Sequence, residues 1–413
     1  MILVFILFGI KLIPQFQYTF AGIFWSLVYQ GIFVIWFVLS VFRSGFWFRY
    51  LKKYLKNWVL WIVYLAMMFL LFSNTQIGFF SLNLTFWEPM IIYYYYMEVL
   101  KDGEKEATFI AIFCVVSLLL GLLQSIQSVS VNELAAREAS SGHLSDDAIL
   151  TGNYSFTATL TILLPTLYIA LLSKITIFWK ILAAIFIGTT FYFIIHCNLM
   201  ISILCLFMTI PIIAISSNNI KLNVKKILKI YLIVISFIII GTICKKILIL
   251  ILEQFAELLN YDEVNKKVSQ LISLLNGSAI GNVESRFGLI AVAWNTFLNN
   301  PLLGIGPQNN AQLFFKTYLG LHATLFDDIA RYGIVGMGIM ISVYRKFFKT
   351  CAKIYVSTSC MRALKTSVVI YIIISMLNPT ISANVGIVLF FVVPTLLNKL
   401  LCIEYTYIQY LKQ

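Results

Sequence analysis

Charged residues are scarce in this chain of 413 residues. Only 11% of the residues are Asp, Glu, Lys or Arg, whereas 61% are hydrophobic, and the mean hydropathy is +0.91. This composition excludes a soluble domain, because apolar runs of about 20 residues, long enough to cross a bilayer as a helix, recur along the chain. The runs are continuous and do not alternate with polar residues, which argues against a transmembrane β-barrel. The sequence therefore predicts an all-α protein that crosses the membrane several times.

Cysteine motifs, a cleavage signal and internal repeats are also missing. The seven cysteines include no CxxC pair and fall in predicted spans or inner segments, so neither disulfides nor a thiolate metal site is indicated. No small-residue cleavage site follows residues 1–13, which are interpreted as a span rather than a signal peptide. The absence of a repeat argues against a transporter built from paired inverted halves.

Basic residues mark one side of the membrane. A formal net charge of +13 would suggest nucleic-acid binding in a soluble protein, but most Lys and Arg here cluster between apolar runs, as they do in inner loops. No nucleic-acid partner is expected. The chain is predicted to form a single integral membrane domain, 1–413, with about twelve spans and both termini inside. The spans lie near residues 1–17, 18–42, 58–78, 79–100, 107–126, 154–173, 177–196, 197–216, 229–250, 323–344, 364–382 and 383–401.

Two predicted outer segments are longer than ordinary hairpins. The first, 127–153, is polar, and the second, 251–322, is the longest stretch without a span. Apolar residues at helical spacing in the second segment predict interfacial helices. Three such helices are predicted, over residues 255–275, 287–299 and 308–320. The second is expected to end at Asn300-Pro301.

His322 is one of only three histidines and stands where the second outer segment meets a predicted span. A neutral imidazole is well suited to act as general base toward a hydroxyl group near neutral pH. The alternative is an interfacial histidine that contacts lipid headgroups or a backbone carbonyl.

Three more charged residues, Asp327, Asp328 and Arg331, follow His322 within ten positions. Asp327 and Arg331 are spaced i,i+4, and Asp328 and Arg331 are spaced i,i+3, so both aspartates can pair with the arginine on one helix. Such pairing lowers the cost of carrying charge into a membrane. Alternatively, one aspartate orients the imidazole of His322.

Arginine is rarer than lysine here, with 7 among the 30 basic residues, and only Arg137 and Arg286 fall in predicted outer segments. A guanidinium grips phosphate oxygens in a bidentate manner, where lysine acts as a point charge. A helix predicted to follow Arg286 would add anion affinity through its N-terminal amides. The alternative for each is a solvated loop charge. Gly304 and Gly306 form a turn whose backbone could approach a ligand closely.

The segment from Ser285 onward resembles a known signature. SRFGLIAVAWNTFLNNPLLGIG, a gap, then HATLFDDIARYGIVG contain an Arg, a Trp-bearing helix, a Pro-Leu-Leu-Gly-Ile-Gly turn, and a His followed eleven residues later by Gly-Ile-Val-Gly. This order is similar to that of the O-antigen polymerase and ligase superfamily (Wzy and WaaL type). The stretch with Arg137 and Asn153 is similar to the family's shorter outer loop. Specific residues match over about 137–165 and 285–338, and the predicted layout of spans matches over the rest.

The resemblance implies a glycosyltransferase C-like fold and metal-independent transfer of a growing glycan from undecaprenyl pyrophosphate. His322 would activate the acceptor hydroxyl. Arg286, together with Arg137, would bind the donor pyrophosphate and stabilise its charge as it leaves. The further substrate contacts expected are Arg331, Asn153, Asp327, Gly304 and Gly306.

No cofactor is expected, and His143 with Asp146 and Asp147 lacks the spacing of a metal site. The partners that the resemblance implies are an undecaprenyl-pyrophosphate-linked oligosaccharide, membrane lipids, and a chain-length regulator and flippase of the same pathway. The expected location is the bacterial cytoplasmic membrane, with the active site on the outer face.

Two departures from the family pattern bear on function. Many relatives carry Ser-Arg at the outer turn where this chain has His196-Cys197-Asn198, and His196 would either replace that cation or be a buried, hydrogen-bonded side chain. Arg331 stands where an acidic or polar residue is common, and would supply the missing charge or pair with Asp327.

The looser match at that turn favours a polymerase of repeat units for capsular or O-antigen-type polysaccharide. A ligase that transfers finished glycan to a lipid or protein acceptor is the alternative. A lipid-linked oligosaccharide transporter is the alternative from a different class.

Overall fold

The computed structural model is all helical in the part of the chain that it describes, with no strand there. Seven of its helices are long and apolar enough to cross a membrane, which confirms the prediction of an all-α, multi-span membrane protein. The described residues are 1–20, 22–44, 51–71, 77–132, 134–141, 149–173, 175–197, 199, 202–203, 206–207, 209, 251, 254, 268–269, 282–306, 319, 323–354 and 358–400.

Several predicted elements lie mostly or wholly outside the described residues. They are the spans near 197–216 and 229–250 and the interfacial helices over 255–275 and 308–320. The helix predicted over 287–299 is confirmed as α16 (Asn282–Asn299), and it ends where Asn300-Pro301 was predicted to stop it.

The N-terminal stretch forms two short helices rather than the single span predicted near 1–17. Helix α1 (Ile2–Leu12) is too short to cross a bilayer alone, and α2 (Pro14–Thr19) follows after a break at Ile13. Ile13 is extended, with φ −93° and ψ 120°, because the ring of Pro14 disfavours the helical region for the preceding residue.

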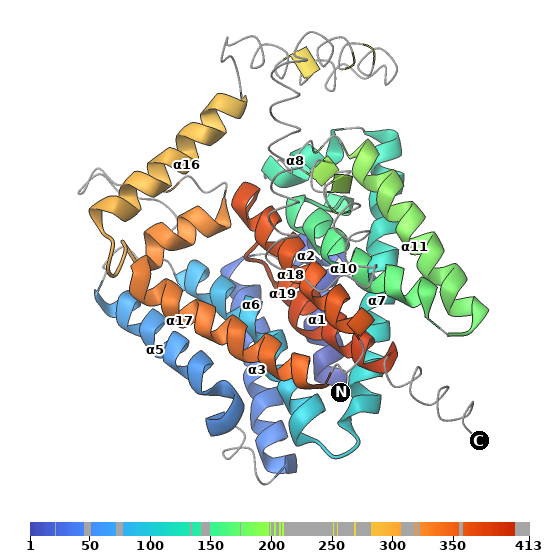
Figure 1. The fold of residues 1–413 in the computed structure, drawn as a ribbon, viewed down its shortest axis with the longest axis horizontal. Coiled ribbons are helices and arrows are strands. Elements are labelled where there is room, and N and C mark those ends of the chain that lie inside the picture. The colour runs from blue at the N-terminus through green and yellow to red at the C-terminus, as the bar shows by residue number, and fades with distance from the viewer. Residues whose placement is uncertain are drawn as a thin grey trace.

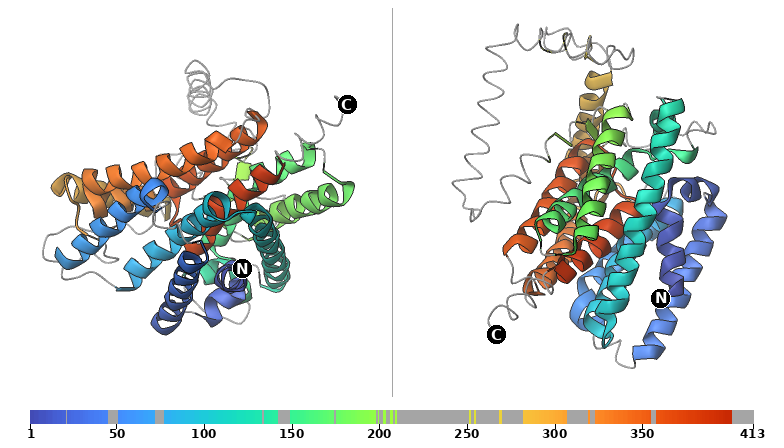
Figure 2. Two further views of the ribbon diagram at one scale, coloured as in Figure 1. Left: turned by 90° about the horizontal axis from the view of Figure 1, so that it is seen from below. Right: turned by 90° about the vertical axis from the view of Figure 1, so that its right-hand side faces the viewer.

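The remaining helices form an up-and-down bundle (Figures 1 and 2). Helix α7 runs past the predicted boundary at 126 to Val131, into the stretch predicted as the first outer segment, and the short helix α8 lies within that same stretch. In chain order, the other elements are α3 (Ile23–Ser44), η1 (Leu51–Leu55), α5 (Lys56–Leu71), α6 (Ile77–Tyr94), η2 (Tyr95–Val99), α7 (Gly103–Val131), α8 (Ala135–Ser141), α10 (Tyr154–Leu172), α11 (Ile177–His196), α17 (Thr324–Ile354), α18 (Thr358–Leu377), α19 (Ala383–Ile387) and η4 (Val388–Val392).

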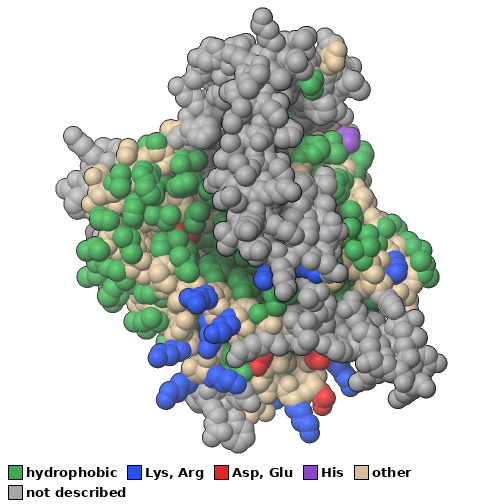
Figure 3. Space-filling view, in the orientation of Figure 1, with side chains coloured by type: hydrophobic (Ala, Val, Ile, Leu, Met, Phe, Trp, Pro, Cys, Tyr) green, Lys and Arg blue, Asp and Glu red, His purple; other side chains and the backbone are tan. Residues whose placement is uncertain are grey.

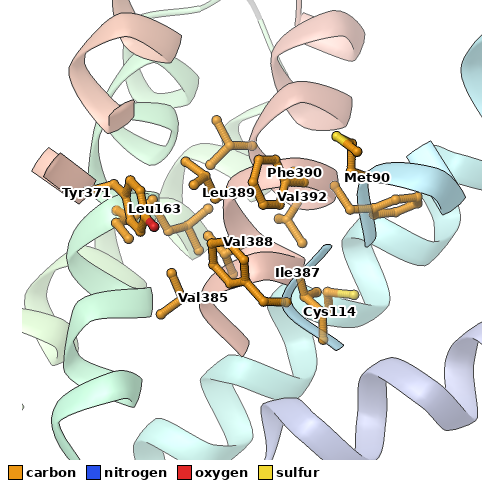
Figure 4. Packing of buried hydrophobic residues seen from close by; sticks show 14 of the residues in the cluster. Met90, Cys114, Leu163, Tyr371, Val385, Ile387, Val388, Leu389, Phe390 and Val392 are labelled. Atoms are coloured by element: carbon orange, nitrogen blue, oxygen red, sulfur yellow. The ribbon is translucent and has the colours of Figure 1, made fainter. Parts of the chain in front are cut away.

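The last span, Ala383–Leu400, which begins with α19 and η4, is the centre of the core. Its residues from Val385 to Val393 are apolar on every side, a pattern typical of a helix that is surrounded by others. They are buried against α6, α7 and α10. Figure 4 shows Phe390 and Val388 of this span among side chains from those neighbours, including Met90 and Leu163.

The two ends of the bundle differ in charge. On the face seen in Figure 3, lysine and arginine side chains gather toward the lower end, which we call the basic end. The end of α3, the start of α7 and the end of the last span lie toward this end (Figure 1), and these segments carry Arg43, Lys105 and Lys399. Helices α8 and α16 lie at the opposite end (Figure 1). Arg137 of α8 and Arg286 of α16, two of the residues predicted to carry chemistry, belong to helices at that opposite end.

Candidate functional site

The structure describes some of the predicted site residues in full, some only in their backbone, and one not at all. His322 lies outside the described residues, and Arg137 and Arg286 are described only in their backbone. The contacts of the other predicted site residues are described: Asn153, Gly304, Gly306, Asp327 and Arg331. The candidate site is therefore built from these five residues and their neighbours.

Arg286 lies within helix α16 rather than ahead of it. The helix begins at Asn282, four residues before the arginine, and not at Phe287 as predicted. The free amides of its first turn therefore belong to the residues that precede Arg286, so the expected arrangement, with a helix N-terminus following the guanidinium, is wrong.

Helix α17 is broken at Gly333, close to its start. Gly333 has φ 57° and ψ −168°, which no helical residue adopts, so α17 consists of a short first part and a long second part. A break of this kind leaves carbonyl groups of the first part and amides of the second part without helical partners. In a buried position such groups must find other partners.

The turn after α16 supplies those partners. Its carbonyls accept from the first amides of the second part of α17, and its amides donate to the last carbonyls of the first part. The four bonds are Ile334 N to Pro301 O at 2.8 Å, Val335 N to Leu302 O at 3.1 Å, Ile305 N to Ala330 O at 3.1 Å, and Gly306 N to Arg331 O at 2.9 Å. The Pro-Leu-Leu-Gly-Ile-Gly turn and the Gly-Ile-Val-Gly segment of the signature are thus in direct contact.

Glycine is required on both sides of this contact. A Cβ on Gly333 would collide with the carbonyl oxygen of Leu302, and one on Gly304 would collide with the carbonyl oxygen of Arg331. Gly304 also has positive φ, at 71°. Of the small residues further along α17, Gly336 packs against Tyr64, as close helix packing predicts, whereas an added Cβ on Gly338 would meet no atom within 4 Å.

Tyr64 of α5 also contacts this junction, by which we mean the place where the turn over residues 301–306 meets the break at Gly333. Its hydroxyl lies 2.8 Å from the carbonyl oxygen of Tyr332 and 3.1 Å from that of Leu303, and it donates to them. The ring of Tyr332 packs edge-on against Trp61, one helical turn before Tyr64. Sequence reasoning missed Tyr64, since it is one tyrosine of 22 and its own segment gives no sign of this role.

Asp328 and Arg331 form a buried ion pair on the first part of α17. Arg331 Nη1 lies 3.3 Å from Asp328 Oδ1. The side chain of Asp328 is 3% exposed and that of Arg331 is 6% exposed. The i,i+3 pairing predicted from the sequence is therefore confirmed. Asp327, which is also buried, accepts a hydrogen bond from the backbone amide of Ala323 at 3.4 Å and so caps the start of the helix.

The start of α17 is joined to the segment that precedes α19. Thr324 Oγ1 accepts a hydrogen bond from the amide of Thr380 at 2.7 Å, and the amide of Thr324 donates to the carbonyl of Asn378 at 3.3 Å. Ser375 and Thr380 share a further hydrogen bond of 2.7 Å between their hydroxyls. All four residues are buried, so this end of the bundle contains a polar interior.

Asn153, an expected substrate contact, caps helix α10. Its Oδ1 accepts from the amides of Ser155 and Phe156 at 3.1 and 3.2 Å, as is common for an N-cap asparagine. The hydroxyl of Ser155 then accepts from Asn384 of α19 at 3.3 Å. The starts of α10 and α19 are thereby linked, in the same polar region as the start of α17.

Tyr18 of α2 connects Asn153 to the helix that carries Arg137. Its hydroxyl donates to the carbonyl of Ala139 in α8 at 2.9 Å. Burial raises the pKa of Tyr18, and a hydrogen bond with Asn153 opposes that rise. The backbone of Arg137 is thus fixed beside the N-terminus of α10, although the two segments are far from Tyr18 in sequence.

His196 ends helix α11 and is held within its own helix. Its Nδ1 lies 2.8 Å from the carbonyl oxygen of Tyr192, and the two rings stack with centroids 4.1 Å apart. The hydrogen bond agrees with the second of the two predicted roles for His196, but the side chain is only partly buried, so the prediction of a buried side chain is wrong.

The starts of α10, α17 and α19 meet at one end of the bundle, where Asn153 caps α10 and the carboxylate of Asp327 accepts from the amide that precedes α17. Within the described residues, no three His, Cys, Asp or Glu side chains lie together as a metal site would require. A search against family models and a search of curated proteins each gave no match.

Proposed function

We propose that the protein is a membrane glycosyltransferase that builds a surface polysaccharide from lipid-linked repeat units. The observation that carries the proposal is the order and spacing of four sequence features: Arg286, the Pro-Leu-Leu-Gly-Ile-Gly turn, His322 and the Gly-Ile-Val-Gly segment that begins at Gly333. The layout proposed with it has about twelve spans, with both termini on the basic side and the site on the outer face of a bacterial cytoplasmic membrane.

The contact between the turn and Gly333 supports this proposal. Two features that are separated in the sequence, and that the resemblance treats as parts of one signature, are hydrogen-bonded to each other. In the sequence, His322 stands between them. A catalytic base needs a fixed position to be effective, and the next residue, Ala323, donates its amide to Asp327 of α17.

In the proposed reaction, the imidazole of His322 accepts the proton of an acceptor hydroxyl as that oxygen attacks the anomeric carbon of the donor. The bond from this carbon to the pyrophosphate oxygen breaks, and its electron pair leaves with undecaprenyl pyrophosphate. Arg286 and Arg137 bind the leaving group and stabilise its developing charge. Asn153, Gly304, Gly306, Asp327 and Arg331 are proposed to shape the substrate pocket.

The decisive experiment reconstitutes the purified protein in vesicles with a lipid-linked repeat unit. Extension into longer lipid-linked glycans supports the polymerase. Transfer of a finished glycan to a different acceptor without extension supports a ligase, and movement of the lipid across the bilayer without either product supports a transporter.

His322→Ala and Arg286→Ala are each expected to abolish chain extension while the protein stays folded. General-base catalysis alone typically contributes about 100-fold to 10,000-fold to a rate. His196→Ala is the matched control, because its imidazole is held by Tyr192, and it should extend glycans normally. Polymer of normal length from His322→Ala would show that the general-base assignment is wrong.

A further inference from the structure

A hydrophobic groove lies between α7, α10, α11 and the last span at the basic end of the bundle. Its cavity has a volume of about 210 Å³, and its walls are almost entirely hydrocarbon. Representative lining residues are Ile112, Val116, Leu167, Trp179, Phe186 and Leu396. Val116 and Trp179 are 42% and 40% exposed, so the groove opens on the outer flank of the bundle, which faces lipid in a membrane protein.

The groove covers most of the depth of one lipid leaflet. Its residues on α7 run from Thr108 to Val116, and the adjoining second cavity extends to Lys105. The eight steps from Thr108 to Val116 rise about 12 Å, against about 15 Å for half of the hydrocarbon core of a bilayer. An acyl chain that enters from the basic end would therefore find apolar contacts over most of its leaflet.

The mouth of the groove is cationic. The second cavity, of about 230 Å³, shares Thr108, Ile112 and Lys399 with the groove and is also lined by Lys105 and Glu104. Lys105 and Lys399 are exposed, and neither ammonium forms an ion pair within the part of the chain that the structure describes. Two ammonium groups beside one carboxylate leave a net positive charge where a lipid phosphate would lie.

Thr166 provides a second, independent sign of an occupant. Its side chain lines the groove and is 1% exposed, yet its hydroxyl has no hydrogen-bond partner within the described residues. A buried hydroxyl without a partner is costly, so a polar atom of a ligand is expected to accept from it. The ester carbonyls of a phospholipid lie between its phosphate and its acyl chains, so a phosphate near Lys399 places a carbonyl inside the groove that Thr166 also lines.

From these features we infer that the groove binds an anionic phospholipid of the leaflet at the basic end. The phosphate lies between Lys105 and Lys399, an ester carbonyl accepts from Thr166, and one acyl chain lies along α7 and α10. A zwitterionic lipid fits less well, because its ammonium would face the two lysines. The site is separate from the proposed catalytic site, so its test does not depend on glycan synthesis.

The test measures lipid binding to the purified full chain in detergent by native mass spectrometry. Phosphatidylglycerol and phosphatidylethanolamine with identical acyl chains are the two probes, and phosphatidylglycerol is expected to bind more tightly. The Lys105→Gln/Lys399→Gln variant should weaken phosphatidylglycerol binding about 30-fold, as expected for the loss of two lysines near an anionic surface. Both side chains are exposed, so folding should be unaffected.

A matched control is Arg345→Gln/Lys349→Gln, which removes the same charge from exposed positions on α17, away from the groove. It should bind phosphatidylglycerol as the wild type does. Thr166→Val conserves shape but removes the hydroxyl, and it should weaken the binding of both lipids several-fold.

Three results would overturn the inference. The first is equal binding of the two lipids by the wild type. The second is an equal loss in the groove variant and in the control variant. The third is displacement of phosphatidylglycerol by an equal concentration of undecaprenyl phosphate, which would assign the groove to a polyprenyl chain instead.

Discussion

Two ion pairs in this protein have similar geometry and opposite surroundings. Asp328 and Arg331 lie 3.3 Å apart with side chains that are 3% and 6% exposed, whereas Arg43 and Glu106 lie 3.0 Å apart with side chains that are 55% and 28% exposed. The exposed pair joins α3 to α7 at the basic end; the buried pair lies within one helix beside the candidate site. The distances between the charged atoms are similar in the two pairs. The difference in burial is therefore expected to decide how much each pair contributes to the free energy of unfolding.

The buried pair should give the largest effect when only one partner is removed. Arg331→Met leaves the carboxylate of Asp328 buried without its cation, a change that typically costs about 3–5 kcal/mol in free energy of unfolding. We expect a strong loss of folded protein and a lowered temperature of thermal unfolding in detergent.

The double variant Asp328→Leu/Arg331→Met is the control for that prediction. It removes both charges and leaves no buried polar group without a partner, so it should recover most of the lost stability, because a buried pair replaced by hydrophobic residues of similar volume is often nearly neutral in stability. If Arg331→Met instead unfolds like the wild type but makes no polymer, Arg331 contacts the substrate and is not structural support.

Breaking the junction below the ion pair should give the next largest effect. Gly333→Ala places a Cβ against the carbonyl of Leu302 at a position with φ 57°. Backbone strain of this kind costs about 1–3 kcal/mol, before the collision is counted. Thermal unfolding in detergent measures the loss, and Gly338→Ala on the same helix should be neutral or slightly stabilising, because nothing opposes its Cβ. Equal effects of both changes would contradict the structure of the break.

Removal of one hydroxyl at the same junction should give a smaller effect. Tyr64→Phe keeps the packing against Gly336 but removes the donor to Tyr332 and Leu303. The expected loss is about 1–2 kcal/mol in free energy of unfolding, since buried carbonyls lose a partner. Tyr192→Phe, at a side chain that is 48% exposed, is the matched control and should unfold like the wild type.

The exposed pair should give the smallest effect. Arg43→Met and Glu106→Gln are each expected to lower stability by less than about 1 kcal/mol, and raising the salt concentration should remove the difference. Thermal unfolding at low and high salt measures this. A loss as large as that of Arg331→Met would show that burial does not separate the two pairs.

Sequence reasoning predicted the local features well. Long apolar runs predicted most of the described spans, helical spacing predicted α16, and i,i+3 spacing predicted the pairing of Asp328 with Arg331. Each of these depends on residues close together in the chain. The break at Ile13 was also readable locally, since Pro14 follows it, but the apolar composition of the stretch favoured a single span.

The features that escaped prediction depend on distant segments. Gly304 and Gly333 were both noticed, but nothing local indicates that the turn at one fills the break at the other. Tyr18 and Tyr64 reach carbonyls in helices far away in the sequence, and their own surroundings resemble those of other tyrosines. The side chains of Arg137 and Arg286 and the position of His322 lie outside the described residues, so their roles stay predictions.

The turn that fills the break in α17 also decides how the chain between Gly306 and Ala323 is attached. Gly306 is bonded to Arg331, and Ala323 to Asp327, so both ends of the intervening stretch are anchored on the same short piece of helix. Closing a loop between anchored ends costs little more when the loop grows, about 0.6 kcal/mol for each doubling of its length. Changes of length between these anchors, made before His322, are therefore expected to cost the bundle little stability, so substrate preference can change in residues 307–321 while the scaffold and the anchor next to His322 stay the same.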